Sequence, residues 1–275
     1  MDGERKGYVT SGPPDLKERL RSFALNLGVD DVGFASADDY RSPLSPPIES
    51  LFPGARSIIV MAFRELSSCE SPSPQIAMNG RLDVMAFIRA SCYRLARFVE
   101  GQLNTPAMTV AFSYPMDLVN SRKTGIAELS LRHAAVAAGL GAFGRHNLVI
   151  HPRFGTRVVF GAVLTKLPLA SDTAVEEDCC TRCNLCVDAC PARALDEEGK
   201  TDRLKCLGIS QPYGVRANIA FWSRFSDAAP AERKAMLDSP EYYSLWQAGF
   251  IGNQYFCFRC FNVCPAGTDR IASAE

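Results

Sequence analysis

The chain has 275 residues, of which 47% are hydrophobic and 22% charged, so it can bury one large core or two smaller ones. Its 30 Lys and Arg residues balance its 30 Asp and Glu residues, so we expect no chain-wide electrostatic attraction to nucleic acid or membranes. The sequence shows no apolar signal segment, no twin-arginine signal and no uncharged stretch long enough to span a bilayer. Reduced thiols and no export signal predict a cytoplasmic protein.

Apolar periodicity predicts helices and strands that alternate up to about residue 168. Helices are expected at residues 15–27, 82–103 and 127–138. Strands are expected at residues 32–35, within 51–63, at 108–112 and at 157–165, and residues 67–75 are expected to form a surface loop. This order predicts an α/β or α+β layer domain over residues 1–168. The shift to cysteine, proline and charge predicts a second module over residues 169–275.

The cysteine run from Cys180 to Pro191 reads C-x-x-C-x-x-C-x-x-x-C-P, which matches the bacterial ferredoxin pattern for [4Fe–4S] clusters. The fourth cysteine of such a run binds a neighbouring cluster, so the run predicts a second one. A shorter copy from Cys257 to Pro265, together with Cys206, supplies the remaining ligands. The first cluster is therefore assigned to Cys180, Cys183, Cys186 and Cys264. The second is assigned to Cys190, Cys206, Cys257 and Cys260.

Disulfides and structural zinc are the alternatives for these cysteines. Zinc sites usually pair two C-x-x-C units across a longer spacer, so four cysteines within eleven residues favour an iron–sulfur cluster. The remaining cysteines, Cys69, Cys92 and Cys179, are expected to be buried or incidental thiols.

A glycine-rich segment, Gly139-Leu-Gly141-Ala-Phe-Gly144, satisfies the G-x-G-x-x-G pattern of dinucleotide-binding folds. That fingerprint must follow a strand, open a helix and precede an acidic residue by about 20 positions. Here a predicted helix precedes it, a strand-like segment follows, and no Asp or Glu occurs between Glu128 and Asp172. We therefore reject a Rossmann site. The glycines instead indicate close approach of the backbone to a flat ligand, or positive φ angles.

These glycines and the double cysteine motif resemble epoxyqueuosine reductases and corrinoid-dependent reductive dehalogenases. The segments that carry the resemblance are Ala138–Gly141, Phe143–Arg145, Asn147–Leu148, Gly155–Arg157, Thr165–Leu169, Leu51–Arg56, Gly80–Asp83 and Gly252–Asn253.

The resemblance implies a nitroreductase-like α/β domain followed by a ferredoxin-like module with two [4Fe–4S] clusters. It also implies base-off cobalamin between them. Electrons from a ferredoxin or flavodoxin would pass through the clusters to reduce Co(II) to Co(I), for reductive removal of oxygen or halogen from a small organic substrate. Nucleic acid is not expected as a partner. Epoxyqueuosine reductases usually extend into a helical-repeat tail for transfer RNA, and this sequence stops shortly after Cys264, so the resemblance supports the corrinoid family better than either substrate.

By matched position, the resemblance implies a corrin cradle. Its candidate residues are Gly139, Leu140, Gly141, Gly144, Arg145, Asn147, Leu148 and Arg157, with Ser210 after Cys206 as a weaker candidate. The arginines could bind corrin amide or phosphate groups, or form surface salt bridges.

A proton donor must lie within hydrogen-bond reach of the substrate and have a tuned pKa. The candidates are Asp117, Tyr114 and Tyr213, followed by His133 and Lys123. Epoxyqueuosine reductases carry a proton-donating aspartate, and its ungapped equivalent here is Gly125; Asp117 could serve only across an insertion. For each candidate, a surface or packing role is the alternative. The resemblance implies no protein ligand to cobalt, so His146 and His151 are not assigned to the metal.

Two competing functions remain open at this point. In one, the chain is a non-catalytic electron carrier or reductive activator of a partner corrinoid protein. In the other, the N-terminal domain binds flavin, as nitroreductase-like folds also do.

Overall fold

The computed structural model describes residues 16–110, 127–175, 179–198, 200–251 and 256–269. A four-stranded sheet in the order β1-β2-β6-β3 lies at its centre, and each neighbouring pair of strands is antiparallel. The strands are β1 (Asp31–Ser36), β2 (Ser57–Arg64), β3 (Ala107–Thr109) and β6 (Val158–Thr165). The central strands β2 and β6 are buried along almost their whole length, which confirms the two predicted buried strands.

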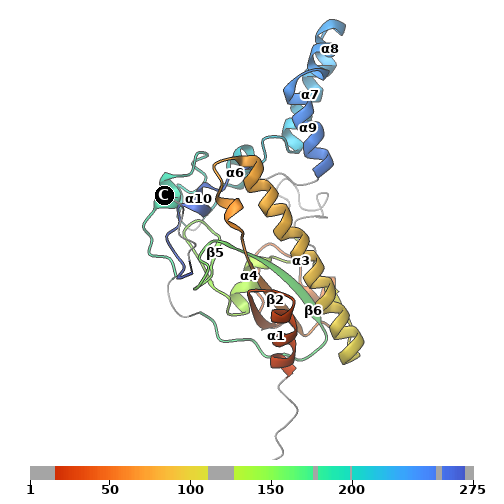
Figure 1. Cartoon of the computed structure of the whole chain (residues 1–275), viewed down its shortest axis with the longest axis vertical. Helices are drawn as coiled ribbons and strands as arrows, with labels where there is room; N and C mark the ends of the chain where they lie inside the picture. Colours follow the sequence, from red (N-terminus) through yellow and green to blue (C-terminus); the bar gives the residue numbers. More distant parts are fainter. Residues whose placement is uncertain (1–15, 111–126, 176–178, 199, 252–255, 270–275) are drawn as a thin grey trace, which may run out of the picture.

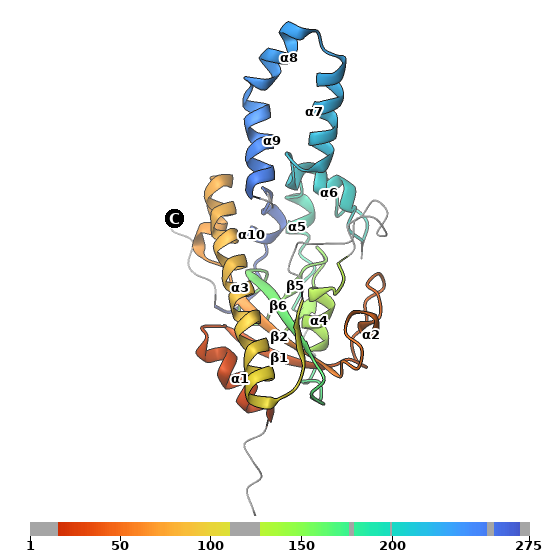
Figure 2. The same ribbon diagram turned by 90° about the vertical axis from the view of Figure 1, so that its right-hand side faces the viewer.

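Helices cover both faces of this sheet, as Figures 1 and 2 show. Successive side chains of a strand point to opposite faces. Ile59 and Met61 of β2 therefore pack into the core under α1 and α3, whereas Ile58 and Val60 pack into the core under α4. The helices are α1 (Leu16–Asn26), α3 (Pro74–Leu103) and α4 (Leu131–Ala137). The result is a mixed α/β fold in three layers.

Two strand glycines let the helices approach the sheet closely. A Cβ at Gly161 of β6 would lie 2.8 Å from the sulfur of Cys92 on α3. A Cβ at Gly33 of β1 would lie 2.2 Å from the carbonyl oxygen of Ala138, at the end of α4. Larger residues at either position would push the layers apart.

Several predicted boundaries differ from the structure. Helix α3 begins at Pro74, eight residues before the predicted start, so residues 67–75 form a 3-10 turn (Ser67–Glu70) and the first helical turn rather than a loop. Ser73 caps α3 by accepting a hydrogen bond from the Ile76 N–H, and Pro74 occupies the first turn, where its missing N–H costs nothing.

Three smaller differences occur elsewhere in the first domain. Helix α4 is shorter than predicted, and a short helix α2 (Ile48–Leu51) was not predicted. Strand β3 covers the start of the predicted strand at 108–112, whose last two residues lie outside the described part of the chain.

The cysteine-rich part follows β6 and packs against the end of the sheet domain that carries a small hairpin. This hairpin consists of β4 (Ala142–Phe143) and β5 (Val149–Ile150). The cysteine-rich part contains the short helices α5 (Leu185–Asp188), α6 (Arg203–Ser210) and α10 (Arg259–Asn262). A domain boundary at residues 168 and 169 stays a prediction, as does the nitroreductase-like description.

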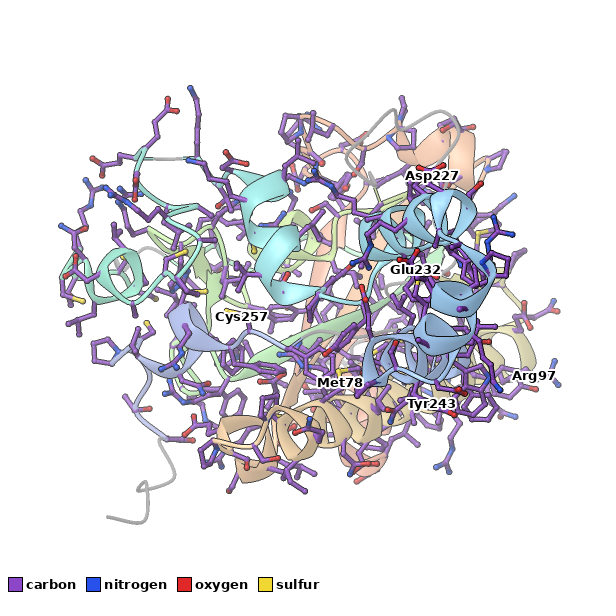
Figure 3. The ribbon with its side chains drawn as sticks, turned by 90° about the horizontal axis from the view of Figure 1, so that it is seen from above. Met78, Arg97, Asp227, Glu232, Tyr243 and Cys257 are labelled. Atoms are coloured by element: carbon purple, nitrogen blue, oxygen red, sulfur yellow. The ribbon has the colours of Figure 1, made fainter. Side chains whose placement is uncertain are left out.

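Three helices between Cys206 and Cys257 project from the body as an arm, which the sequence reasoning did not predict (Figures 1 and 2). They are α7 (Val215–Asp227), α8 (Pro230–Leu237) and α9 (Pro240–Ile251). Phe221 of α7 is fully buried and stacks with Tyr242 of α9, which joins the two long helices. Viewed from above, Figure 3 shows the arm tip at Asp227 and Glu232, with Cys257 to one side. None of the helices in the described residues is apolar over enough length to cross a bilayer.

Candidate iron–sulfur centre and adjoining cleft

The first predicted thiol set lines one cavity. Cys180, Cys183 and Cys186 surround it from one segment and Cys264 from another, almost 80 residues further along the chain. Helix α5 carries Cys186, and α10 ends just before Cys264; the two helices lie side by side (Figure 2). The fourth ligand of this set thus comes from the other cysteine motif, as the exchange pattern of two-cluster ferredoxins requires.

The second predicted thiol set gathers around Cys260. Burial, together with the charges of the neighbouring Cys257, Cys206 and Cys190, raises the pKa of the Cys260 thiol to about 12. Cys186 of the first set also contributes, so the two sets adjoin each other. The chemistry of these two donor sets fits [4Fe–4S] clusters, which are held by four thiolates each. Ligation of iron by either set stays a prediction.

The loop between the ligands of the first set adopts an uncommon backbone. Arg182 and Asn184 have φ angles of 55° and 61°, in the left-handed region that non-glycine residues rarely occupy. Such conformations cost about 1–3 kcal/mol each and persist where the surrounding structure requires them. Here they turn the chain between successive cysteines, so that the three thiols face one cavity.

Backbone donors already point at two of the thiols. The Arg145 N–H donates to the Cys180 sulfur at 3.3 Å, and the Ala194 N–H donates to the Cys190 sulfur at 3.4 Å. Such hydrogen bonds stabilise a thiolate and influence the potential of a cluster that it binds. Within the described ranges, no three His, Cys, Asp or Glu side chains are grouped for a single metal ion. The four thiolates of a cubane bind different irons and therefore stand further apart.

The other cysteines behave largely as expected. Cys69 and Cys92 are buried, and burial raises the pKa of their thiols to about 11 and 12, which confirms them as buried thiols. Cys179 is half-buried and lines the first cavity beside Cys180.

A cleft of about 530 Å³ adjoins the first cavity, and Arg145, Cys180 and Arg182 line both. Its volume lies in the range of pockets for organic ligands. Phe143 and Leu44 add apolar walls. Arginine donors and apolar walls together fit the amide-fringed macrocycle of a corrinoid.

The predicted cradle residues divide between this cleft and the protein interior. Gly144, Arg145 and Asn147 line the cleft. Leu148 instead packs against Phe258 and Phe261. The remaining predicted residues, Gly139, Leu140, Gly141, Arg157 and Ser210, are not in the cleft lining.

Two of the glycines accommodate the protein's own backbone, which favours the second predicted alternative, positive φ angles, over close approach to a flat ligand. A Cβ at Gly139 would lie 2.3 Å from the carbonyl oxygen of Thr173. A Cβ at Gly141 would lie 2.3 Å from that of Ile150, and both glycines have positive φ angles. Their function in the structure is the turn from α4 into the β4–β5 hairpin.

Arg157 is buried and faces the second cysteine motif. Its guanidinium donates to the carbonyl oxygens of Cys264 at 2.9 Å and Asn262 at 2.8 Å, and forms an ion pair with Glu70. The neighbouring Thr156 hydroxyl donates to the Phe261 carbonyl at 2.8 Å. Arg157 was predicted to contact the corrin, but in the structure its contacts are with the protein itself. Together with Thr156 it holds the backbone around Cys264 against the sheet.

A second arginine supports the same motif. Arg81 of α3 lies over the rings of Phe258 and Phe261, at 5.3 and 5.4 Å from their centroids, and forms an ion pair with Glu65. Glu65 is almost fully buried, and desolvation raises its pKa to about 7 despite the opposing effect of Arg81. Sequence reasoning matched Arg81 to the family but did not foresee this contact.

The structure places few of the predicted proton donors at the cleft. Asp117, Tyr114 and Lys123 lie outside the described residues, as do Gly125 and the Gly252–Asn253 match. Tyr213 is half-buried near Phe256 and is not in the cleft lining. His133 does line the cleft.

The His133 ring is held by its surroundings at the cleft wall. Its Nδ1 is 2.7 Å from the Ser130 hydroxyl. Burial, followed by the charge of Arg132, lowers the pKa of His133, which favours the neutral imidazole.

Two other histidines are in the interior. His151 pairs with Asp31 at 3.1 Å and stacks on Phe154. His146 lines the first thiol cavity, and burial lowers its pKa to about 4. The pocket position of His146 could not be anticipated from the sequence, which separates it from Cys180 by more than 30 residues.

Comparisons with known proteins bear on the first cysteine motif and on the fold. A family model described as a 4Fe-4S binding domain matches residues 173–196, which include Cys180, Cys183, Cys186 and Cys190. The epoxyqueuosine reductase of Bacillus cereus is 29% identical over 276 residues, covering 91% of this chain and 64% of that protein. That of Staphylococcus aureus is 26% identical, covering 94% of this chain and 66% of its own length. The chain thus spans about two thirds of the length of these relatives.

Solved structures show the same fold at low sequence identity. An epoxyqueuosine reductase from Streptococcus thermophilus superposes with a TM-score of 0.59 at 18% identity, covering 95% of this chain and 68% of that one. A catabolic reductive dehalogenase in complex with 3-bromo-4-hydroxybenzoic acid gives a TM-score of 0.50 at 20% identity, covering 71% and 29%.

A third structure bears on the expectation about nucleic acid. An epoxyqueuosine reductase bound to a modified tRNA stem loop matches with a TM-score of 0.52 at 22% identity, covering 70% of this chain and 56% of that one. This relative binds RNA, so it does not support the expectation that nucleic acid is no partner. The resemblance that the motifs indicated is confirmed: the chain is similar in sequence to epoxyqueuosine reductases and shares its mixed α/β fold with them and with a reductive dehalogenase.

Proposed function

We propose that this chain is a corrinoid- and iron–sulfur-dependent reductase that removes oxygen from an organic substrate. The observation that carries the proposal is the arrangement of two adjoining sets of four thiols beside an open cleft. Such an arrangement suits electron delivery through two clusters to a cofactor in the cleft. The similarity to epoxyqueuosine reductases over 91% of the chain favours removal of oxygen over removal of halogen.

The chain's own residues supply binding and positioning. The eight cysteines would hold the two clusters, and Gly144, Arg145 and Asn147 would contact the corrinoid in the cleft. When bound, the clusters supply single electrons and the corrinoid supplies a strongly nucleophilic, low-potential cobalt. Arg145 connects the two sites, since its backbone donates to Cys180 and its side chain lines the cleft.

Electrons would come from a small low-potential donor such as a ferredoxin or flavodoxin. Because the first thiol set adjoins the cleft, the second cluster is the outer one in this arrangement and would receive electrons first. Reduced thiols and labile clusters fit a cytoplasmic location.

The proposed substrate is an epoxide-bearing modified nucleoside in RNA, with a free small organic epoxide or halide as the alternative. A relative bound to a tRNA stem loop supports RNA. His133 lies in the cleft, but its lowered pKa makes it a weak source of protons. Asp117 and Tyr114 therefore stay candidate proton donors with it, and Tyr213 is a weaker one because it is outside the cleft lining.

The test is turnover by anaerobically purified, cluster-reconstituted protein that has been incubated with cobalamin or with flavin. Reduction of an epoxyqueuosine-containing stem loop that requires cobalamin supports the proposal in full. Reduction of a free epoxide or organohalide alone supports the chemistry and rejects RNA. No turnover and no retained corrinoid, combined with reduction of a partner corrinoid protein, supports the electron carrier instead. Retained flavin that restores activity without cobalamin contradicts the proposal.

A further inference from the structure

The imidazole of His146 is fixed in one orientation in the wall of the first thiol cavity. The side chain is 4% exposed and lines the cavity together with Cys180, Cys186 and Cys264. The Leu148 N–H donates to its Nδ1 at 3.1 Å. Nδ1 therefore accepts, and in the neutral ring Nε2 carries the proton.

The Nε2 donor has no acceptor among the described residues. It is enclosed and makes no hydrogen bond to any described residue. A buried donor without a partner costs about 1–3 kcal/mol.

The local backbone is built to admit this ring. A Cβ at Gly144 would lie 2.7 Å from the Cε1 atom of His146, so any larger residue would displace the imidazole. The adjacent Arg145 N–H already donates to the Cys180 sulfur. The consecutive residues Arg145 and His146 thus each supply a donor at the wall of the first thiol cavity, one with its acceptor in place and one without.

Resting on the cluster assignment in the proposed function, we propose that the His146 Nε2–H group donates a hydrogen bond to a sulfur atom of the first cluster. The bond stabilises the more negative, reduced cluster, and hydrogen bonds to cluster sulfurs are among the determinants of reduction potential. His146 is thereby a positioning and tuning residue for electron transfer. The second cluster, held by the other thiol set, is unaffected.

The first experiment is a redox titration followed by electron paramagnetic resonance on His146→Leu, His146→Gln and wild-type holoprotein. The leucine variant removes the donor and the glutamine variant keeps an N–H near the same place. We expect His146→Leu to lower the equilibrium constant for reduction of the first cluster about tenfold, which is 59 mV for one electron. The second cluster should keep its potential in all three proteins, and His146→Gln should recover part of the shift. A matched control, His133→Leu, removes a histidine from the cleft instead and should change neither potential.

The second experiment uses the fact that the chain has three histidines. With histidine-specific ¹⁵N labelling, pulsed resonance spectra of the reduced wild-type protein should show a nitrogen coupling that is lost in His146→Leu. If the reduced wild-type protein shows no such coupling, the proposal is wrong. This outcome does not depend on whether the leucine variant folds. Unchanged potentials in a folded His146→Leu variant overturn it as well. A wild-type protein that holds no clusters instead contradicts the proposed function.

Discussion

The guanidinium of Arg157 donates to the carbonyl oxygen of Cys264 at 2.9 Å, so a side chain at the start of the sheet's central strand β6 holds the backbone of a predicted cluster ligand. The same guanidinium holds the Asn262 carbonyl and pairs with Glu70. These contacts join the sheet to the second cysteine motif. They do so at Cys264, which lies in the second motif but belongs to the first thiol set.

Replacing Arg157 should weaken the first cluster selectively. Arg157→Met removes both carbonyl contacts, and loss of supporting contacts around metal ligands typically costs about 10–100-fold in metal retention. We expect faster loss of the first cluster in air, measured by iron content and resonance spectra. The control Arg153→Met removes an exposed ion pair with Asp269 in the same interface and should have little effect. Equal cluster stability in the two variants would show that Arg157 does not support Cys264.

The exchange of ligands between motifs makes a second prediction. Cys264→Ser should damage the first cluster and Cys190→Ser the second, although each residue lies in the other cluster's motif. Each variant should fall from about eight irons per chain toward about four, with the spectrum of the opposite cluster retained. Cys179→Ser, at a neighbouring half-buried thiol, is the control and should retain all the iron. Loss of the same cluster in both variants contradicts the assignment.

The turn at Gly141 makes a prediction about stability. Gly141→Ala forces a side chain into a positive φ and against the Ile150 carbonyl, so we expect a loss of at least about 1–3 kcal/mol in the free energy of unfolding. Gly101→Ala in α3 is the matched control, because its Cβ meets nothing within 4 Å. That variant should gain about 0.5–1 kcal/mol. Chemical denaturation measures the free energy of unfolding of both variants. Equal values would show that a side chain at position 141 does not clash with the Ile150 carbonyl.

Buried Glu65 should make stability depend on pH. Its pKa is raised from 4.5 to about 7 in the folded protein, so between these values the folded state binds more protons than the unfolded state. The stability that protonated Glu65 contributes is therefore fully present below about pH 4.5 and is lost as the pH rises through 7. Relative to Glu65→Gln, the wild type should lose up to about 3 kcal/mol across this window. Parallel stability curves for the two proteins would show that Glu65 does not titrate there.

Much of the sheet could be predicted from local sequence, because the β-branched runs of β2 and β6 are buried on both faces and keep that signature. The spacing of the cysteines also predicted that Cys264 joins Cys180 and Cys186, because in two-cluster ferredoxins the last cysteine of one motif binds the other cluster. The start of α3 was missed although Ser73 and Pro74 carry the usual signals of a helix start.

Other features depend on long-range contacts that spacing does not encode. The two carbonyl partners of Arg157 lie more than 100 residues away, and Gly141 meets Ile150 only after the hairpin forms. The arm was not predicted, although Val215, Ile219 and Trp222 of α7 recur at helical spacing. These side chains are exposed, so their spacing does not mark a face packed on the core.

The most direct test of the central claim is the metal content of one anaerobically reconstituted sample incubated with cobalamin and freed of excess cofactor. We predict about eight irons and one cobalt per chain, with the resonance signal of base-off Co(II). About four irons or fewer, or iron without retained cobalt, would contradict a cluster-linked corrinoid reductase.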